Sequence, residues 1–422
     1  MPPGIPYTSS VMDPHVSFAG LLVVAALAFA APLMASAVPG RPIPAVVLLI
    51  VGGIILGQSG LGLVTVDEPI RILALLGLAV LLFLAGLEVE IGQLRGNRLR
   101  TALVGLALSG GLALVTSAGL GAAGLAEAPL LLAVILIGTS VGIVIPVLSD
   151  AGLAHASFGQ TLIAAVSVAE VGSIVLLSVV FSRSARGPLE GFLLLVLLIT
   201  LATALIFAVL RTERSMRLAP LLQRLQDTTA QIRVRGAWLL MVGFAALAEA
   251  LGLEVILGAF LAGAILNVID ADGSMNHPAF RTKLEAVGHG VFVPVFFVAT
   301  GLRFDVGALL ASPTALLRVP IFIGALLIVR GLPAIAFRGS GSRREILGAG
   351  LIQATLLPIA PTQIGLELGL LDPATAAALI TAGLVAAVVF PAVALRQFGR
   401  ALPLSAALPG STIRGDLPGA PT

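Results

Sequence analysis

One acidic side chain stands near the middle of an otherwise apolar stretch. Glu170 lies in TLIAAVSVAEVGSIVLLSVVF, which runs from Thr161 to Phe181. A charge at the centre of a membrane-spanning helix costs about 2.5 to 3.5 kcal/mol on insertion scales, so it must face a cavity, have a partner or carry a proton. Burial favours the neutral acid, and a nearby cation favours the carboxylate. The residue therefore predicts a group that holds a proton and a monovalent cation in turn.

Hydroxyl side chains are suited to complete such a cation site, because hydroxyl and freed backbone carbonyl oxygens are hard donors. Four residues are the candidates: Thr139, Ser140, Ser167 and Thr355. Two alternatives stay open. Glu170 can be a protonated residue bonded only to Ser167, Ser173 or a neighbouring helix, and the hydroxyls can bond only to their own helix backbone.

A second deep charge, Arg330, lies in LLIVRGLPAIAF. We expect it to compensate the charge of Glu170 when no cation is bound. The alternative is an arginine whose side chain reaches the cytoplasmic interface. Charged residues closer to the predicted helix ends are interpreted as boundary charges: Glu88, Glu90, Glu249, Glu254, Arg303 and Arg318.

Residue types exclude several kinds of catalysis. The sequence has no cysteine, which excludes disulfides, thiol catalysis and thiolate metal sites. Its four histidines are expected in loops or at helix ends, without the spacing of a transition-metal site: His15, His155, His277 and His289. The sequence shows no phosphate-binding glycine loop and no nucleophile triad. We expect a protein that is not an enzyme and has no cofactor.

Membrane-spanning helices must position these residues. Hydrophobic residues make up 58% of the 422 residues and charged residues 11%, with a mean hydropathy of +1.11, which is typical of a membrane protein. We predict an all-α integral membrane protein with an N-terminal tail (1–16), a transmembrane domain (17–398) and a disordered cytoplasmic tail (399–422). About thirteen spans are predicted: 17–38, 43–57, 70–87, 101–122, 129–148, 159–182, 189–210, 236–252, 254–268, 288–302, 313–337, 345–366 and 373–397.

Basic residues predict the orientation of these spans. With the N-terminus outside, about eighteen arginine and lysine residues fall in inside loops or the tail and about four fall outside. This bias favours a cytoplasmic C-terminus. It also explains the sequence pI of about 10.4, because the arginines lie between hydrophobic runs and form no patch with interleaved aromatic residues. We expect membrane lipid and no nucleic acid as a partner.

Two stretches indicate an internal repeat. LIGTSVGIVIP (136–146) aligns with LIQATLLPIAP (351–361), matching Ser140 with Thr355 and Pro146 with Pro361. Proline blocks a continuous helix, so we expect each run to break within the membrane, where irregular backbone survives only beside a cavity. The runs are the fifth and twelfth predicted spans, and an odd separation inverts their orientation. Inverted repeats with broken helices are typical of secondary transporters.

Several motifs, in this order, resemble those of the monovalent cation:proton antiporter-2 family, the bacterial Kef-like and Nap-like sodium/hydrogen exchangers. The motifs are LLFLAGLEVE (81–90), GTSVGIVIPVLSDAG (138–152), the Glu170 helix, ALGLEVILGAFLAGAIL (250–266), VPVFFVATGLRFD (293–305) and LGLLDPATAAALITAGL (368–384). The similarity runs across nearly the whole chain. It implies a bacterial-type inner membrane location.

The resemblance implies two crossed, broken helices in an ion-carrying core of about 101–182 and 288–397. The remainder would form a scaffold that holds a homodimer, and transport would follow elevator-like alternating access. Family members commonly carry Asp at the position of Glu170, preceded by Asp, Asn or Gln, whereas this sequence has Ala169-Glu170. The missing second group argues against electrogenic exchange. Larger Kef-like members carry a nucleotide-sensing domain, which the 399–422 tail is too short to hold.

We therefore expect exchange of Na⁺ or K⁺ for H⁺ at Glu170. A single carboxylate that carries one proton one way and one monovalent cation the other moves no net charge, so we predict electroneutral exchange. Two alternatives remain. One is a sodium-coupled symporter of an organic anion, which needs an anion-binding group in the cavity. The other is a membrane sensor that transports nothing and in which Glu170 is only packed.

Overall fold

The computed structural model describes residues 18–37, 44–89, 96–181, 188–215, 231–271, 278–311, 313–337, 341–356 and 358–398. Its helices are α1 (Phe18–Ala37), α2 (Ala45–Leu56), α3 (Glu68–Leu87), α4 (Gly96–Ala122), α5 (Pro129–Ile137), α6 (Val141–Asp150), α7 (Ser157–Val180), α8 (Pro188–Ser215), α10 (Ile232–Ala250), α11 (Val255–Ala271), α12 (Pro278–Val287), η2 (Gly288–Phe292), α13 (Val293–Leu302), α14 (Val306–Leu310), α15 (Pro313–Leu326), η3 (Leu327–Gly331), η4 (Leu332–Phe337), α16 (Arg343–Gln353), α17 (Ile359–Glu367) and α18 (Pro373–Gln397).

The all-α prediction is confirmed: throughout the described ranges the regular structure is helical, and each of the predicted spans contains a helix. Seven helices are long and apolar enough to cross a membrane, and shorter apolar helices accompany them. Two helices begin earlier than the spans predicted from hydropathy: α4 begins at Gly96 and α10 at Ile232. The predicted tails, 1–16 and 399–422, lie outside the described residues, as do Glu90, His15 and His277.

Polar residues fix several helix starts. The Asp67 carboxylate accepts a hydrogen bond from the Ile70 N–H at 3.0 Å, and Pro69 follows in the first turn of α3. A capping box joins Ser342 and Glu345 at the start of α16. Such caps satisfy backbone N–H groups that have no partner inside the helix. These starts are therefore fixed by short local patterns within long apolar runs.

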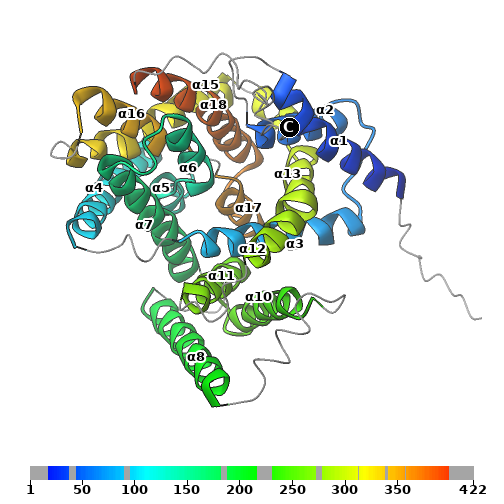
Figure 1. The fold of residues 1–422 in the computed structure, drawn as a ribbon. Coiled ribbons are helices and arrows are strands. Elements are labelled where there is room, and N and C mark those ends of the chain that lie inside the picture. The colour runs from blue at the N-terminus through cyan, green and yellow to red at the C-terminus, as the bar shows by residue number, and fades with distance from the viewer. Residues whose placement is uncertain are drawn as a thin grey trace, which may run out of the picture.

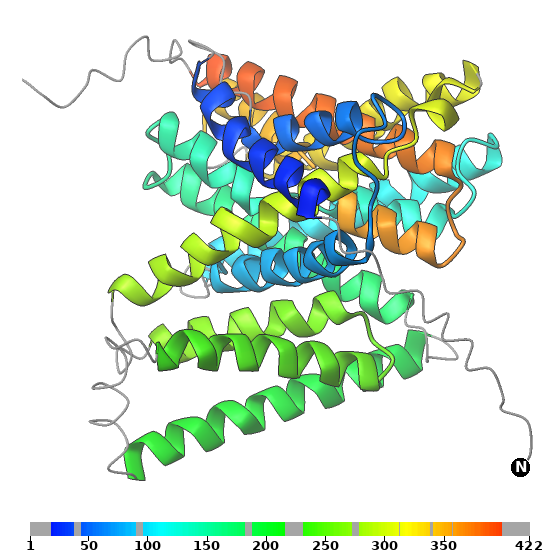
Figure 2. The same ribbon diagram turned by 90° about the vertical axis from the view of Figure 1, so that its right-hand side faces the viewer.

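The helices form two bodies (Figures 1 and 2). In the core body, α4 packs on α5 and α7, while α18 packs on α15 and α16. In the scaffold body, α3 packs along α11 and α13, α2 along α13, and α10 along α11. The bodies meet through fewer contacts, including those of α7 with α8 and α11. Although α13 falls within the predicted core range, its contacts place it against α2 and α3; the functional division into core and scaffold stays a prediction.

Glycine pairs let the scaffold helices approach closely. A Cβ added to Gly53 on α2 would lie 2.9 Å from the Cα of Gly301 on α13. A Cβ added to Gly86 on α3 would lie 3.1 Å from the Cα of Gly263 on α11. Only a residue without a side chain permits these backbone contacts, as is usual where membrane helices pack closely.

The two glycine contacts are equivalent under an internal repeat. A shift of 210 residues carries the α2 glycine onto the α11 glycine, and a shift of 215 carries the α3 glycine onto the α13 glycine. The second shift also aligns Ser140 with Thr355. Because α2 and α3 contain the second and third predicted spans and α11 and α13 the ninth and tenth, the odd separation inverts the repeat. The predicted inverted repeats are thus confirmed by the two glycine contacts, which lie outside the two aligned stretches from which the repeat was predicted.

Both proline-containing runs are broken, and the breaks cross. The chain leaves the helix at Gly138–Ser140, between α5 and α6, and again after Gln353, before α17. The Thr139 hydroxyl donates a hydrogen bond to the Gln353 carbonyl at 3.1 Å, so the two interruptions touch. The predicted cause needs correction. Pro146 lies inside α6 and Pro361 in the first turn of α17, where proline is tolerated, so neither residue marks the break itself.

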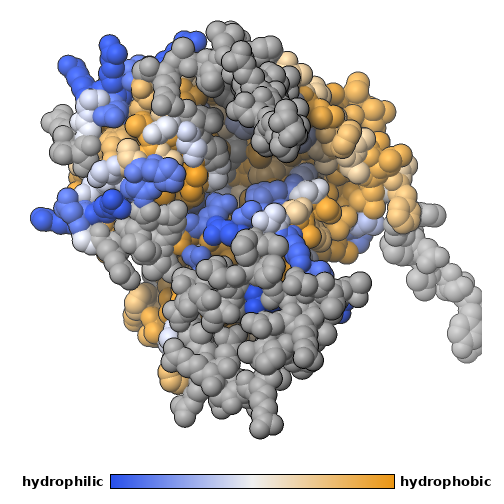
Figure 3. Space-filling view, viewed as in Figure 1, coloured by the Kyte–Doolittle hydropathy of each residue, from blue (hydrophilic) through white to orange (hydrophobic). Residues whose placement is uncertain are grey.

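Hydrophobic side chains gather on the face over α1, at the upper right of Figure 3. Phe18, Leu22 and Phe29 of this helix are 78%, 70% and 74% exposed. Exposed apolar helix faces of this size fit contact with lipid acyl chains. The predicted homodimer interface is not tested by these positions.

Candidate functional site

Glu170 occupies the middle of α7 and reaches the break between α5 and α6. Its Oε2 accepts a hydrogen bond from the Val141 N–H at 3.0 Å. Val141 is the first residue of α6, and the preceding Ser140 makes no side-chain cap at this end. The first N–H groups of a helix lack intrahelical partners and carry partial positive charge, which favours an anion. The carboxylate is therefore held by a helix end that the chain break creates inside the protein.

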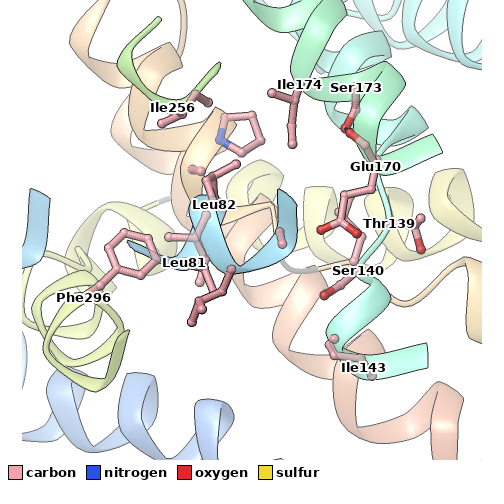
Figure 4. Close-up of a pocket in the computed structure, with 18 of the residues that line it drawn as sticks. Leu81, Leu82, Thr139, Ser140, Ile143, Glu170, Ser173, Ile174, Ile256 and Phe296 are labelled. Atoms are coloured by element: carbon pink, nitrogen blue, oxygen red, sulfur yellow. The ribbon is translucent and has the colours of Figure 1, made fainter. Parts of the chain in front are cut away.

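A cavity of about 260 Å³ opens beside this carboxylate, between the core and scaffold bodies. Its walls are mostly apolar, and Figure 4 shows Leu81, Leu82 and Phe296 across the space from Glu170. A separate small pocket, called the narrow extension below, shares Ala85, Glu88 and Glu170 with the cavity and is also lined by Ser167. The acidic group therefore faces a cavity large enough for several waters or a hydrated ion.

The predicted hydroxyl ligands divide into two groups. Ser140 and Thr139 line the cavity with Glu170 and lie beside its carboxylate in Figure 4. Ser167 is buried and lines only the narrow extension. Thr355 is fully buried in the interruption after α16, and its hydroxyl donates to the Leu351 carbonyl near the end of α16 at 3.2 Å. The structure thus brings three of the four candidates to the site and directs Thr355 away from it.

Ser173 does not hold the carboxylate either. Its hydroxyl donates to the backbone carbonyl of Glu170 at 2.9 Å, one turn along α7, although Ser173 also lines the cavity. The alternative of a Glu170 side chain bonded to Ser173 is therefore not what the structure contains. The described hydrogen-bond donor to this carboxylate is the backbone of α6.

Arg330 lies deep in the core body but does not contact Glu170. Its guanidinium donates to the Ser109 hydroxyl at 3.1 Å and to the Gln353 side-chain oxygen at 3.5 Å. Arg330 is only 2% exposed, which excludes the alternative of an arginine reaching the interface. Because Gln353 ends α16 and its carbonyl accepts from Thr139, the positive charge lies at a helix C-terminus beside the crossing, which favours a cation.

Two ionisable residues of the cavity were missed by sequence reasoning. Glu88 and His289 line the same cavity as Glu170, and Glu88 also lines its narrow extension. Glu88 ends a hydrophobic run, so the sequence indicates only a boundary charge. His289 was expected at the start of the span 288–302, but α12, η2 and α13 continue one another from 278 to 302. The local π-helical turn at Gly288–Phe292 is a feature common at functional sites, and no sequence signal announces it.

The other predicted boundary charges have varied positions. Glu249 and Arg303 are exposed, as expected. Arg318 is mostly buried in a network with Glu127 and Asp372, with ion-pair distances of 3.6 and 3.4 Å. Glu254 lies at a helix boundary, directly before α11, but it is buried (7% exposed), and its backbone N–H donates to the Ser178 hydroxyl at 3.2 Å.

The chemistry available here is the reversible binding of a cation or a proton. Among the described residues, no group of three or more His, Asp or Glu side chains is placed to hold a metal ion as a resident centre. A carboxylate, hydroxyl oxygens and freed carbonyls at the crossing of two broken helices suit transient binding of an alkali ion. This fold and site define a secondary transporter, with its ion site where inverted repeats meet.

The sequence matches the family described as "Sodium/hydrogen exchanger, transmembrane" over residues 23–395. The chain belongs to this family, which confirms the resemblance inferred from its motifs, and it is a membrane transporter, not an enzyme. It is 29% identical over 397 residues to the putative Na⁺/H⁺ antiporter YjbQ of Bacillus subtilis, covering 89% of this chain and 62% of YjbQ. It is 30% identical over 370 residues to the probable Na⁺/H⁺ antiporter 3 of Methanocaldococcus jannaschii, covering 84% of this chain and 91% of that protein.

The fold is also that of a solved structure. The sodium proton antiporter MjNhaP1 from Methanocaldococcus jannaschii, determined at pH 8, superimposes with a TM-score of 0.64. The alignment covers 91% of this chain and 98% of that one at 18% identity. At this identity the similarity concerns the arrangement of helices.

Proposed function

We propose that this protein exchanges a monovalent cation, Na⁺ or K⁺, for H⁺ across the membrane, with Glu170 as the shared binding group. The observation that carries the proposal is the position of the Glu170 carboxylate. It lies in a cavity at the crossing of the two broken helices and accepts a hydrogen bond from the first N–H of α6. Family membership and the relatives named above support the same activity.

Competition at one carboxylate couples the two ions. When Glu170 is ionised, its oxygens offer ligands to a cation, together with the hydroxyl oxygens of Ser140 and Thr139, two residues that line the same cavity. When Glu170 is protonated, that site has lost its negative charge and releases the cation. One proton in one direction and one monovalent cation in the other move no net charge, so exchange is electroneutral. The charge of Glu88 does not enter this charge balance, because Glu88 stays on the scaffold while the core moves.

Alternating access follows from the two bodies. Glu170, Ser140 and Thr139 belong to the core, whereas α3 and α13 of the scaffold form the opposite wall of the cavity. Displacement of the core along this largely apolar wall carries the site from one membrane face to the other. An ion-free, unprotonated core would have to drag a bare carboxylate through the barrier, which makes uncoupled return slow.

Glu88, the C-cap of α3, and His289 in η2 are among the residues that line the cavity, and we infer that the cavity opens toward this end of α3. Arg98 at the start of α4 and Arg281 and Lys283 on α12 belong to loops and helix ends on the same predicted side. By the positive-inside bias this side is the cytoplasm. We infer an inward-facing state with the N-terminus outside, on the basis of this positive-inside bias.

The alternative transport class fits the cavity poorly. A symporter of organic anions needs a cationic group to bind its substrate, but the residues known to line the cavity include Glu88 and Glu170 and neither Arg nor Lys. An anion would therefore meet two acidic side chains and a mostly apolar wall. A passive sensor would not need a carboxylate at such a cavity, since burying it costs free energy without a gain in stability.

Everted membrane vesicles with a pH-sensitive dye test the proposal. Addition of Na⁺, K⁺ or Li⁺ to respiring vesicles should dissipate the proton gradient for the transported cation. Glu170→Gln should abolish this response while the purified variant keeps its size-exclusion profile, and Glu249→Gln, at an exposed carboxylate that does not line the cavity, should retain it. Exchange that persists in Glu170→Gln removes Glu170 from the mechanism. Cation uptake driven by an imposed membrane potential alone contradicts electroneutrality.

A further inference from the structure

The C-caps of α3 and α13 are equivalent positions that carry opposite charges. The shift of 215 residues that relates the repeats carries Gly86-Leu87-Glu88 onto Gly301-Leu302-Arg303. Glu88 is the C-cap of α3 and Arg303 the C-cap of α13, with nearly the same backbone angles. Because the repeats are inverted, the two helix ends that carry these charges are expected to point toward opposite membrane faces.

Glu88 lines the cavity and its narrow extension together with Glu170, and His289 also lines the cavity. The end of the cavity beside the C-terminus of α3 is its inner mouth in the proposed inward-facing state. The charged groups nearest on α12 are Arg281 and Glu285, which pair with each other at 3.1 Å. A helix C-terminus carries partial negative charge and disfavours a carboxylate there. Glu88 and the last carbonyls of α3 therefore add to a negative potential that attracts cations toward Glu170.

Arg303 is outside the cavity in this state. It is exposed at the end of α13, with Glu367 and Arg71 as neighbouring charges. At a helix C-terminus a cation is the favoured charge, so local stability explains Arg303 more readily than Glu88. Glu88 and Arg303 thus differ in their charge and in whether a helix C-terminus favours that charge. They also differ in position, since only Glu88 lines the cavity that contains the ion site.

Exchange of the two repeat conformations gives the position expected of Arg303 in the opposite state of the transporter. The present cavity is lined by residues 81–88 of α3 and 289–297 of η2 and α13. Under the shift of 215 residues, residues 81–88 correspond to residues 296–303 of α13, and residues 289–297 correspond to residues 74–82 of α3. Inverted-repeat transporters alternate between two such related states. In the outward-facing cavity, Arg303 would take the place that Glu88 has now.

We propose that Glu88 and Arg303 give the two mouths of the ion pathway opposite electrostatic potentials, so that the site binds cations more tightly from the inside than from the outside. This proposal rests on the proposed exchange at Glu170. Both charges act on the site from the scaffold and remain there during transport. They set the ion concentrations at which each face operates and leave the final equilibrium of the exchange unchanged.

The potential acts equally on Na⁺ and on H⁺, since both carry one positive charge, and this gives the proposal a specific pH signature. At alkaline pH, where few protons compete, the half-saturating Na⁺ concentration falls in proportion to the attraction by Glu88. At acid pH the same attraction also concentrates the competing proton, and the two effects cancel. An ionised group about 10 Å away at an intermediate dielectric changes affinity several-fold, on the order of 3- to 10-fold.

Proteoliposomes with a known fraction of each orientation, probed with Na⁺ and a trapped pH dye, test this. Glu88→Gln should raise the half-saturating Na⁺ concentration several-fold from the inner face at alkaline pH, with no change from the outer face and convergence with the unmodified protein at acid pH. Arg303→Gln should lower it from the outer face only. Glu88→Asp should keep the half-saturating Na⁺ concentration at the inner face equal to that of the unmodified protein. Glu249→Gln should leave the half-saturating Na⁺ concentration unchanged at both faces.

The maximal exchange rate measures the amount of folded transporter separately, so a variant that folds poorly still reports its half-saturating concentration. Shifts of equal size from both faces, a shift that persists at acid pH, or the absence of the expected shift at either mouth overturns the proposal. Such results leave exchange at Glu170 intact. Exchange that survives Glu170→Gln, in contrast, removes the proposed function whatever the two mouth variants do.

Discussion

The Thr139 hydroxyl donates a hydrogen bond to the Gln353 carbonyl at 3.1 Å, across 214 residues of sequence, at the point where both broken helices are interrupted. A break exposes carbonyls and N–H groups that a continuous helix would satisfy, and within a membrane these need partners. Val141 finds its partner in Glu170, and Gln353 finds one in Thr139. The ion site and the crossing are thus stabilised by the same few contacts.

Thr139→Val should weaken the crossing, because a methyl group replaces the hydroxyl donor and leaves the buried Gln353 carbonyl without this partner. We expect a loss of about 1 to 3 kcal/mol of stability and slower exchange. Thr139→Ser, which keeps the hydroxyl, should behave like the unmodified protein. Thermal aggregation in detergent, followed by light scattering, and vesicle exchange rates measure both effects. Equal stability of the Val and Ser variants would contradict the role of this bond.

Ser140 and Thr355 are equivalent in the two repeats but differ in position, since only Ser140 lines the cavity and Thr355 bonds to Leu351. Ser140→Ala should raise the half-saturating cation concentration severalfold, because a cation loses one oxygen ligand. Thr355→Val should leave that concentration unchanged. Sodium titration of vesicle exchange measures both. Similar shifts in the two variants would show that Thr355 reaches the ion in another state of the transporter.

Hydropathy and local composition were enough to locate the helices, the inverted repeat and the deep carboxylate. A buried Glu in an apolar run costs free energy wherever the helix lies, so its importance is visible without tertiary structure. The exchanger assignment could likewise be made from the order of the motifs. These features depend on single segments or on their sequence order.

Features that depend on how segments face each other could not be predicted. Glu88 ends a hydrophobic run, and nothing in that run shows that α3 turns this end toward Glu170. Arg330 was expected to compensate the charge of Glu170, but its side chain extends from η3 toward Ser109 and Gln353 and donates hydrogen bonds to them. The break in the first run occurs at Gly138, whose surroundings include Leu356 of the other run, and not at Pro146. Each of these outcomes is set by packing between distant segments.

Glycine contacts in the scaffold predict the effect of adding one methyl group. Gly86→Ala places its Cβ against backbone atoms of α11 that cannot move without shifting the helix. We expect a loss of at least about 1 to 3 kcal/mol of stability, and the repeat-equivalent Gly301→Ala should behave alike. Gly105→Ala is the matched control, because no atom lies within 4 Å of its Cβ, and its greater helix propensity should be neutral or stabilising by up to about 1 kcal/mol. Thermal stability in detergent ranks the three variants, and a stable Gly86→Ala would show that α3 and α11 are less tightly packed than described.

The network of Arg318, Glu127, Asp372 and Thr375 ties the loop before α5 to the start of α18. Arg318 lies between both acids, and the Arg318 guanidinium also donates to the Thr375 hydroxyl at 2.6 Å. Removing the cation leaves two acidic groups facing each other without compensation. Arg318→Ala should therefore cost about 1 to 3 kcal/mol of stability, and Glu68→Gln, at an exposed ion pair elsewhere, should cost well under 1 kcal/mol. A small loss in Arg318→Ala would show that solvent screens the network.

The same network predicts a pH dependence of stability. Partial burial raises the pKa of the Asp372 carboxyl, but hydrogen bonds from Thr375 and the charge of Arg318 outweigh burial, so the pKa lies below its usual value of 3.8. A group whose pKa is lowered by folding contributes stability above its unfolded value and loses that contribution as the pH falls toward the folded value. The difference in melting temperature between the unmodified protein and Asp372→Asn should therefore be constant from neutral pH to about pH 5 and shrink below about pH 4. Light scattering is a suitable readout, because the chain has no cysteine for thiol dyes. A difference that grows as the solution is acidified would reverse the sign and show that Asp372 is bound in its protonated form.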